Sequence, residues 1–443
     1  MKYVIIGNGA AGIHAAEAIR ESDSEGSITM IGDETINPYC RPMISLLLEG
    51  AIQPDKLPIR GSDFYDNLKI RPVLGKRVSG IDVDNKIVFI QNGERNLRSV
   101  LAHLLDKLMS VTGVKPDPVK AGNSETAFTY DKLLIATGAD PRPVKVGGQD
   151  LENIFYMRTE THVREISEAV PNVRNALVLG GGPVGFKAAY GLMQCNINVT
   201  IIEREDRLFP LRADETASGM ILEEVSAHDL KVKLGTEVTS FEGTRKVESA
   251  RLSDGTEIPC DMAVICIGVL PALSFVPRDK IQVDLGILIN PQMETTAPGI
   301  FAAGDVAEMT DIARKTPWVN AIWPEATAQG RIAGTNMAGR RSVEYKGSLG
   351  RNTIHIFGLD LMTGGLINPP SDDPQYEILS HSDPRLKTYR KLVFREDKLV
   401  GMIMVNSVEQ GGVLLSLIQS ETPFRVPKEL LLEPSFNYGQ LLT

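Results

Sequence analysis

Cysteine is scarce in this chain: it occurs four times in 443 residues, at positions 40, 195, 260 and 266. So small a number argues against a fold held together by disulfides. Cys260 and Cys266 lie in one apolar stretch that we expect to be a single strand, where six residues span about 20 Å, too far for a disulfide. Because no pair of cysteines has the spacing of a metal site, we also predict no metal centre.

Long apolar runs and an excess of positive charge are missing as well. No run approaches the roughly 18 apolar residues that cross a bilayer, and the chain starts with a strand and a glycine turn rather than a secretory leader. We therefore expect a cytoplasmic protein without a membrane span. The net charge of −9 and the pI near 5.4 argue against nucleic acid as the main partner, because phosphate binding needs a basic surface. The length predicts two or three globular domains.

What the sequence does contain is a glycine-rich turn near its start. The segment KYVIIGNGAAGIHAAEAIR indicates a short strand, a turn with Gly7, Gly9 and Gly12, and a helix that opens with Ala10 and Ala11. The first glycine would permit the tight turn, the second would let the backbone approach a pyrophosphate, and the third would allow helix and strand to pack closely. The N–H groups at the helix start then face the phosphates. This pattern predicts a dinucleotide-binding unit.

The same unit recurs at residues 176–203, ALVLGGGPVGFKAAYGLMQCNINVTIIE. Its turn holds Gly180, Gly182 and Gly185, and Pro183 and Val184 stand at the start of the helix. The two turns lie about 170 residues apart, which implies two nucleotides in one chain. That combination is typical of a flavoprotein that exchanges electrons with a nicotinamide.

An acidic residue follows each turn at the distance where a ribose hydroxyl is bound. After the first turn Gly32 occupies the usual position, so Asp33 or Glu34 must hold the ribose, and we favour Glu34. After the second turn Glu203 is well placed, and its carboxylate would repel a 2′-phosphate, which favours NADH over NADPH. Arg204 nearby would weaken that preference.

Three further segments complete a recognisable pattern: YDKLLIATGADPRP at 130–143, DMAVICIGVLPAL at 261–273 and TTAPGIFAAGDVAE at 295–308. With the two turns they resemble the FAD-dependent pyridine nucleotide–disulfide oxidoreductase superfamily, most of all rubredoxin and ferredoxin reductases and the flavin domain of NADH-dependent nitrite reductases. The resemblance covers essentially the whole chain. It implies an α/β fold with two Rossmann-like domains of the glutathione-reductase type, the NAD domain inserted in the FAD domain, and a C-terminal α/β interface domain.

The resemblance also implies domain limits. The FAD domain would comprise residues 1–145 and 271–345, the NAD(P)H domain residues 146–270, and the interface domain residues 346–443. In relatives the interface domain mediates dimers or covers the flavin, so a homodimer through this part is one expectation.

The resemblance further implies contacts with the two cofactors. The helix IWPEATAQGRIAGTNMAG would lie beside the flavin ring, although a helix that only packs in the core would show the same pattern. Gly268 would line the NAD site. The residues implied to contact FAD are Val78 beside the adenine, Ala136, Thr137 and Gly138 in the turn that closes over FAD, Gly304 and Asp305 beside the ribityl chain, and Pro324, Glu325 and Ala326 at the flavin edge.

The stretch INPYCRPMIS holds the one cysteine that is a candidate for a redox-active thiol. The Cys-x-x-x-x-Cys pair of the disulfide reductases is missing, whereas PYCRPMIS resembles the PYxRPxLS of reductases with iron–sulfur or rubredoxin partners. In that pattern Cys40 takes the variable position and lines the flavin pocket, and Arg41 is the fixed residue near the FAD pyrophosphate, where a bidentate cation suits phosphate. The alternative is a redox-active Cys40, as in NADH oxidases, peroxidases or CoA-disulfide reductases.

Two features depart from the resemblance. Where relatives carry a glutamate after the second turn, this chain has Lys187, which would hold the nicotinamide carboxamide, favour a flavin anion, pair with a carboxylate such as Glu325, or simply be solvated. The second departure is an insertion at about 94–124, whose apolar residues recur with helical spacing. This helical insertion would either pack on its own FAD domain or dock a partner subunit.

These features together predict an FAD-dependent NAD(P)H oxidoreductase. It would exchange electrons between NAD(H) and a one-electron partner, either a rubredoxin or an iron–sulfur protein, as the flavin subunit of a larger redox complex. The alternatives are an NADH oxidase, a peroxidase or a CoA-disulfide reductase that uses Cys40, or a flavoprotein without catalytic activity. The first hypothesis places Lys187 and Glu325 at the catalytic centre.

Overall fold

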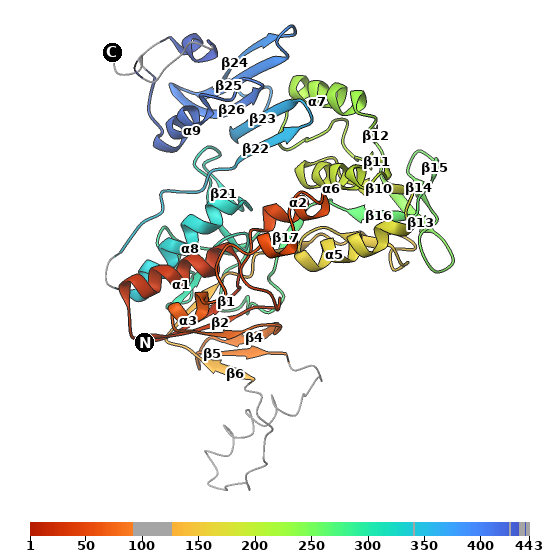
Figure 1. Ribbon diagram of the computed structural model, residues 1–443. Coiled ribbons are helices and arrows are strands. Elements are labelled where there is room, and N and C mark those ends of the chain that lie inside the picture. The colour runs from red at the N-terminus through yellow and green to blue at the C-terminus, as the bar shows by residue number, and fades with distance from the viewer. Residues whose placement is uncertain (92–125, 340–341, 425–426, 434–438, 440–443) are drawn as a thin grey trace, which may run out of the picture.

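The computed structural model describes residues 1–91, 126–339, 342–424, 427–433 and 439. Figure 1 shows an N-terminal part in red and orange that is completed by the cyan helix, a central part in yellow and green, and a blue C-terminal part built on one sheet. The N-terminal and central parts repeat one plan. Each has a parallel sheet with helices on one face and a small antiparallel sheet on the other.

The N-terminal part contains a five-stranded parallel sheet. Its strands, in sheet order, are β19 (Ile300–Ala302), β7 (Lys132–Ile135), β1 (Lys2–Ile6), β2 (Ser27–Ile31) and β3 (Ile70–Val73). Side chains alternate along the central strand. Tyr3 and Ile5 pack against α1 (Ala10–Ser22) and α8 (Trp323–Ala338), whereas Val4 and Ile6 face the small sheet of β4 (Val78–Asp82), β5 (Ile87–Ile90) and β6 (Ala127–Thr129).

Helices α1 and α8 touch backbone to backbone. A β-carbon on Gly330 would stand 2.2 Å from the backbone oxygen of Ala11, and one on Gly334 would stand 2.3 Å from that of Ala15. Since both contacts advance by four residues, the helices run parallel. Their N-termini therefore lie at the same end of the sheet.

The central part repeats this arrangement. Its parallel strands, in sheet order, are β12 (Lys231–Lys233), β11 (Asn198–Ile202), β10 (Asn175–Leu179), β16 (Met262–Ile265) and β9 (Ile154–Tyr156). One face packs against α5 (Glu160–Ala169), α6 (Pro183–Gln194) and α7 (Glu215–Ala227). The other face packs against the antiparallel sheet of β13 (Val238–Glu242), β14 (Ser249–Leu252) and β15 (Glu257–Pro259).

The C-terminal part is an antiparallel sheet with one helix. Its strands, in sheet order, are β22 (Arg351–Ile356), β23 (Leu359–Gly365), β26 (Lys398–Val405), β25 (Thr388–Arg395) and β24 (Tyr376–Asp383). Helix α9 (Gly411–Ser420) covers one face. Ile356, Leu361 and Val405 belong instead to the core cluster of the central part, so these two parts share one hydrophobic core.

Short elements join the parts. The chain leaves and re-enters the N-terminal part through the antiparallel ribbon of β8 (Ala139–Pro141) and β17 (Val269–Pro271). The remaining described α-helices and strands are α2 (Ile44–Leu48), α3 (Phe64–Asn67), β18 (Ile287–Leu288), β20 (Ala307–Thr310) and β21 (Pro317–Trp318).

Two parallel sheets and a C-terminal α/β part agree with the fold class expected from the sequence. One buried strand, β16, lies in the stretch around Cys260 and Cys266 as expected, but it is shorter than predicted, and the two cysteines flank it. The insertion at 94–124 lies outside the described residues, and the domain limits stay predictions. Among the described helices, none is both long and apolar enough to cross a bilayer.

Candidate active site

One large cavity lies where the three parts of the chain meet. Its volume is about 2230 Å³, above the roughly 300–1,000 Å³ of most small-molecule pockets. The turns of both glycine motifs open into it, as do the first residues of α8 and β22. A cavity of this size with two phosphate-binding turns has room for two dinucleotides.

The first glycine turn has the backbone geometry that a pyrophosphate requires. Gly7 has a φ of +120°, and a β-carbon there would stand 2.1 Å from the oxygen of Ala136. A β-carbon on Gly12 would stand 2.0 Å from the oxygen of Gly7, so Gly12 serves close packing. Gly9 differs, because no atom of the described residues lies within 4 Å of a β-carbon built on it. The free space in front of Gly9 fits a bound pyrophosphate.

The second turn repeats each of these features. Gly180 has a φ of +104°, and a β-carbon there would stand 2.5 Å from the oxygen of Cys266. One on Gly185 would stand 1.8 Å from the oxygen of Gly180, whereas Gly182 meets no described atom within 4 Å. Helix α6 begins at Pro183, whose missing N–H would be unpaired at this position in any residue. This turn also fits a pyrophosphate.

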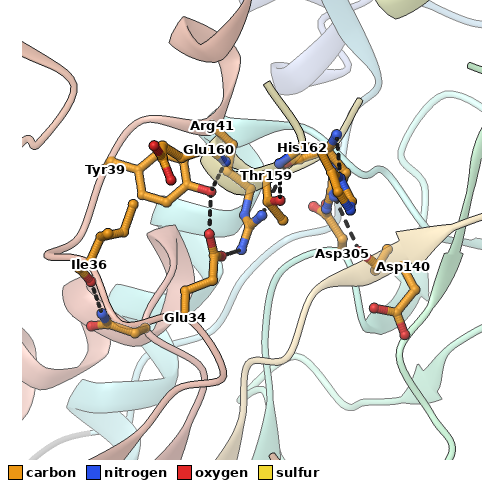
Figure 2. A network of polar contacts seen from close by, with 12 residues as sticks. Glu34, Ile36, Tyr39, Arg41, Asp140, Thr159, Glu160, His162 and Asp305 are labelled. Atoms are coloured by element: carbon orange, nitrogen blue, oxygen red, sulfur yellow. Dashed lines mark hydrogen bonds and ion pairs between the residues drawn. The ribbon is translucent and has the colours of Figure 1, made fainter. Parts of the chain in front are cut away.

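A charged network surrounds the acid predicted to hold the FAD ribose (Figure 2). Glu34 accepts a hydrogen bond from the Tyr39 hydroxyl at 2.7 Å and forms an ion pair with Arg41. Arg41 also donates to the backbone oxygen of Arg158 at 3.1 Å. Asp33 is exposed on the cavity wall. Glu34 is the more preorganised of the two candidates, because two partners hold it through a hydrogen bond and an ion pair, whereas Asp33 acts on Arg41 only through its charge.

Asp305, predicted to contact the ribityl chain, is paired with a residue that the sequence analysis missed. Arg158 donates to its Oδ2 atom at 2.6 Å and to the oxygen of Ala139 at 3.2 Å. The two charged residues are 147 positions apart in sequence. No local motif relates them, and only the approach of the central part to the N-terminal part brings them together.

Glu203 lies at the end of β11 beside the second turn. Its side chain is buried, and it accepts hydrogen bonds from the N–H of Gly181 at 2.6 Å and from that of Glu205 at 2.9 Å. These contacts hold the carboxylate against the turn, where a ribose would lie. Arg204 is exposed and pairs with Glu205 at 2.9 Å, so its charge is directed to a neighbour along the chain.

Lys187 lines the cavity from α6, but its carboxylate partner is not the one suggested. Its Nζ lies 3.9 Å from Oε1 of Glu49, and the ammonium also stands over the Tyr190 ring, 5.6 Å from the centroid. Glu325 pairs elsewhere. The suggested pair of Lys187 with Glu325 is therefore wrong, because α6 packs on α2, whereas α8 packs on α1.

Glu325 sits in the first turn of α8 and is fully buried. Its carboxylate accepts from the Tyr345 hydroxyl at 2.5 Å and forms an ion pair with Arg351 at 2.9 Å. Burial raises the pKa of this carboxyl, and the two partners oppose that rise. Glu325 is not among the described residues that line the cavity, whereas Arg351 is. The side chain of Glu325 therefore lies behind the wall and holds Arg351, and its predicted place at the flavin edge stays a prediction.

Cys40 also stands beside the cavity wall rather than in it. Its neighbours Tyr39 and Arg41 line the cavity, but Cys40 is not among the described lining residues, and a Cys40 that lines the flavin pocket stays a prediction. Burial raises the pKa of the Cys40 thiol. A raised pKa lowers the fraction of reactive thiolate at neutral pH, which weighs against a redox thiol.

The other residues predicted at the nucleotide sites gather on one surface. Gly12 and Gly185 pack within the turns and do not reach it. Which cofactor atom each remaining residue meets stays a prediction. The residues on the cavity wall are Gly7, Gly9, Ala10, Ala11, Asp33, Glu34, Arg41, Val78, Ala136, Thr137, Gly138, Gly304, Asp305, Pro324 and Ala326 from the FAD set, Gly180, Gly182, Pro183, Val184, Glu203, Arg204 and Gly268 from the NAD set, and Lys187, predicted as a catalytic residue.

Two family models match this chain. Residues 1–330 match the pyridine nucleotide-disulphide oxidoreductase family. Residues 351–422 match the C-terminal domain of rubredoxin NAD+ reductase. The first match covers both glycine turns and ends within α8, and the second covers β22 to α9.

Individual proteins resemble the chain over its length. Subunit epsilon of the NADH-dependent phenylglyoxylate dehydrogenase from Aromatoleum evansii is 28% identical over 423 residues, which are 95% of this chain and 92% of that protein. The assimilatory nitrate reductase electron transfer subunit of Bacillus subtilis (strain 168) is 25% identical over 434 residues, or 98% of this chain, which spans 51% of that relative's length. The reductase in a covalent putidaredoxin reductase–putidaredoxin complex superposes with a TM-score of 0.83 at 24% identity, covering 100% of this chain and 98% of that one. This likeness confirms the expected fold class.

Proposed function

The chain belongs to the pyridine nucleotide-disulphide oxidoreductase family, and from this premise we propose that it exchanges electrons between NAD(H) and a rubredoxin or an iron–sulfur protein. Membership makes it an oxidoreductase that uses FAD and a nicotinamide nucleotide. One observation carries the choice of acceptor: the described cavity wall has both nucleotide turns, and its cysteine is a buried thiol with a raised pKa. Cys266 is the one cysteine among the described lining residues, and burial raises its pKa to about 12.

The first turn and the network around Glu34 would hold FAD. Gly9 would leave room for the pyrophosphate, Glu34 would accept from the ribose hydroxyls, and Arg41 would donate to phosphate oxygens. Asp305, oriented by Arg158, would accept from the ribityl chain. Bound FAD supplies the chemistry that the chain lacks, namely the exchange between a two-electron donor and one-electron acceptors.

The second turn would hold NAD(H), with a preference for NADH over NADPH. Glu203 is the residue that supports this preference. It is already fixed by the N–H of Gly181, so it cannot turn away from a 2′-phosphate without losing that bond. Lys187 would stand where the nicotinamide meets the flavin. Its ammonium group would orient the carboxamide, and its positive charge would be compatible with negative charge on either cofactor.

The overall reaction balances with two molecules of a one-electron partner. NADH and two oxidised partners give NAD+, one proton and two reduced partners, or the reverse. A subunit of a larger redox complex suits this role, because the described part of the chain offers no group of three or more metal-ligating side chains for a cluster of its own. The two relatives are a dehydrogenase subunit and an electron transfer subunit, which supports the same assignment. A homodimer through the C-terminal sheet is the second assembly that we propose, and the cytoplasmic location stays a prediction.

Anaerobic reduction tests this proposal. NADH should bleach the absorbance of the FAD-loaded protein, and a clostridial-type rubredoxin or ferricyanide should restore it in one-electron steps. Cys40→Ser should keep more than half of this turnover, as should Cys195→Ser, a matched control for replacing a partly buried cysteine. Near-total loss of this turnover in Cys40→Ser, but not in Cys195→Ser, would favour an NADH oxidase, a peroxidase or a CoA-disulfide reductase. FAD that stays bound but is not bleached would indicate a flavoprotein without catalysis.

A further inference from the structure

A buried carboxylate lies directly behind the cavity lysine. Glu49 stands at the C-terminal end of α2, and its side chain is 9% exposed, whereas that of Lys187 on α6 is 29% exposed. Lys187 lines the cavity and Glu49 is not among the described lining residues. The pair therefore points from the protein interior toward the cofactor space, with the cation in front.

Glu49 has no other described means of neutralising its charge. Its Oε1 atom is buried and lacks a hydrogen-bond partner among the described residues. The C-terminal end of a helix carries partial negative charge and does not favour an anion. Burial raises the pKa of Glu49, and Lys187 opposes that rise. Lys187, at 3.9 Å, is thus the group that compensates this carboxylate.

The two helices that carry the pair are held closely together. A β-carbon on Gly191 of α6 would stand 2.8 Å from Cγ of Leu48, the residue before Glu49. Leu48 and Ile44 of α2 belong to the same buried cluster as Phe186 and Leu192 of α6. The distance between Glu49 and Lys187 is therefore set by packing, and the lysine stays on the cavity wall where the FAD and NAD units meet.

We propose that Glu49 is a positioning residue that anchors Lys187, and that this charge pair sets the reduction potential of the bound flavin. The inference rests on the proposed function, in particular on FAD in the first site. A cation on the wall favours the reduced cofactor, which carries more negative charge, and the carboxylate behind it weakens that effect. Neutralising the two residues should therefore move the potential in opposite directions.

Redox titration of the FAD-loaded variants with reference dyes tests this pair. Lys187→Gln should lower the equilibrium constant for flavin reduction about tenfold, or about 30 mV for a two-electron couple. Glu49→Gln, which keeps the side-chain volume, should raise it by a similar or smaller factor. The double variant should return close to the original potential, and Lys187→Arg, which keeps the charge, should change it least. Lys233→Gln is the control, because it removes a cation of the same central part whose ion pair with Asp254 is exposed.

Opposite shifts in the two single variants would support the pair as a potential-setting device. Shifts of the same sign, or none beyond that of Lys233→Gln, would overturn it, since a merely structural role perturbs both variants alike. The outcome is separable from the proposed function. If NADH bleaches the original protein while the potentials do not move, only the charge-pair inference fails, and if NADH does not bleach it, the proposed function fails.

Discussion

At the scale of single residues, Gly9 and Gly182 occupy equivalent places in the two turns, and a β-carbon on either would meet no described atom within 4 Å. Both have negative φ, −95° and −85°, which any L-residue adopts. Their need for glycine therefore comes from the ligand rather than from the chain. Gly12 and Gly185 are the reverse case, because a β-carbon on either would collide with backbone.

We predict that Gly182→Val folds normally and retains FAD but loses NADH affinity by about tenfold or more, because its methyl groups enter the pyrophosphate space. Gly185→Ala, whose β-carbon would stand 1.8 Å from the Gly180 oxygen, should instead lose several kcal/mol of stability. Thermal unfolding and stopped-flow reduction by NADH separate the two effects. A Gly182→Val protein with an unchanged NADH affinity would mean that the nucleotide does not pass over this turn.

Glu203→Gln should shift the preference toward NADPH. The amide oxygen can still accept from the N–H of Gly181, now 2.6 Å from Oε2, which keeps the turn in place. The bond from the N–H of Glu205 is lost, and the charge that repels a 2′-phosphate is gone. We expect the ratio of kcat/KM for NADPH to that for NADH to rise about tenfold. Steady-state kinetics with both nucleotides measure this ratio. An unchanged ratio would place the ribose 2′ position away from Glu203.

Residues in the two turns and at the strand ends could be predicted because a short motif contains its own geometry. Arg158 and Glu49 could not, since their partners Asp305 and Lys187 lie more than a hundred positions away and meet them only through packing between parts. The same limit explains why the partners of the Glu325 side chain could not be predicted. Its place in the WPEA segment is correct for a helix N-terminus, but the helix turns that side chain inward toward Arg351.

At the scale of elements, the start of α8 depends on a buried charge. The pKa of Glu325 is raised by burial in the folded protein, so folding favours its protonated form. The resulting contribution to stability is fully present below the unfolded pKa of about 4.3 and is lost as pH rises through the higher folded pKa. Tyr345 and Arg351 reduce this loss without abolishing it.

Comparison of the original protein with Glu325→Gln should reveal this linkage. In the glutamine variant the amide oxygen can accept from Arg351 and the amide NH2 can donate to the Tyr345 hydroxyl oxygen, and the side chain does not titrate. The free energy of unfolding of the original protein, relative to that of the variant, should therefore fall as pH rises from about 4 toward neutral. Urea unfolding at a series of pH values measures the difference. A difference that is constant, or that grows with pH, would mean that Arg351 outweighs burial at this site.

The elements themselves could largely be predicted, because the apolar run of β1, which is buried on both faces, and the glycine turns before α1 and α6 each consist of adjacent residues. The close contact of α1 with α8 could not. It depends on Gly330 and Gly334 meeting Ala11 and Ala15, and only the assembled sheet sets which small residues face each other. The same contact brings both helix N-termini to the cavity.

At the scale of the whole molecule, Asp214 joins the central part to the C-terminal sheet. It caps α7 by accepting from the N–H of Ala217 at 3.0 Å. Its other oxygen accepts from the Tyr389 hydroxyl at 2.7 Å and pairs with Lys391 at 3.1 Å. The side chain of Asp214 is 15% exposed and that of Lys391 is 10% exposed. Because the two parts also share a hydrophobic core, we expect them to unfold together.

Asp214→Asn should test that expectation. The amide can still cap α7, but Lys391 is left buried without its counter-ion, so the free energy of unfolding should fall by about 2–3 kcal/mol. Asp254→Asn is the matched control: Asp254 also accepts from a backbone N–H and pairs with Lys233 at 3.3 Å, but its side chain is 45% exposed, so the loss should be much smaller than in Asp214→Asn. Urea unfolding followed by circular dichroism and by flavin release should show one transition that shifts as a whole. If instead the circular dichroism transition splits while flavin release stays in place, the C-terminal sheet unfolds on its own, and the shared core does not couple the site to it.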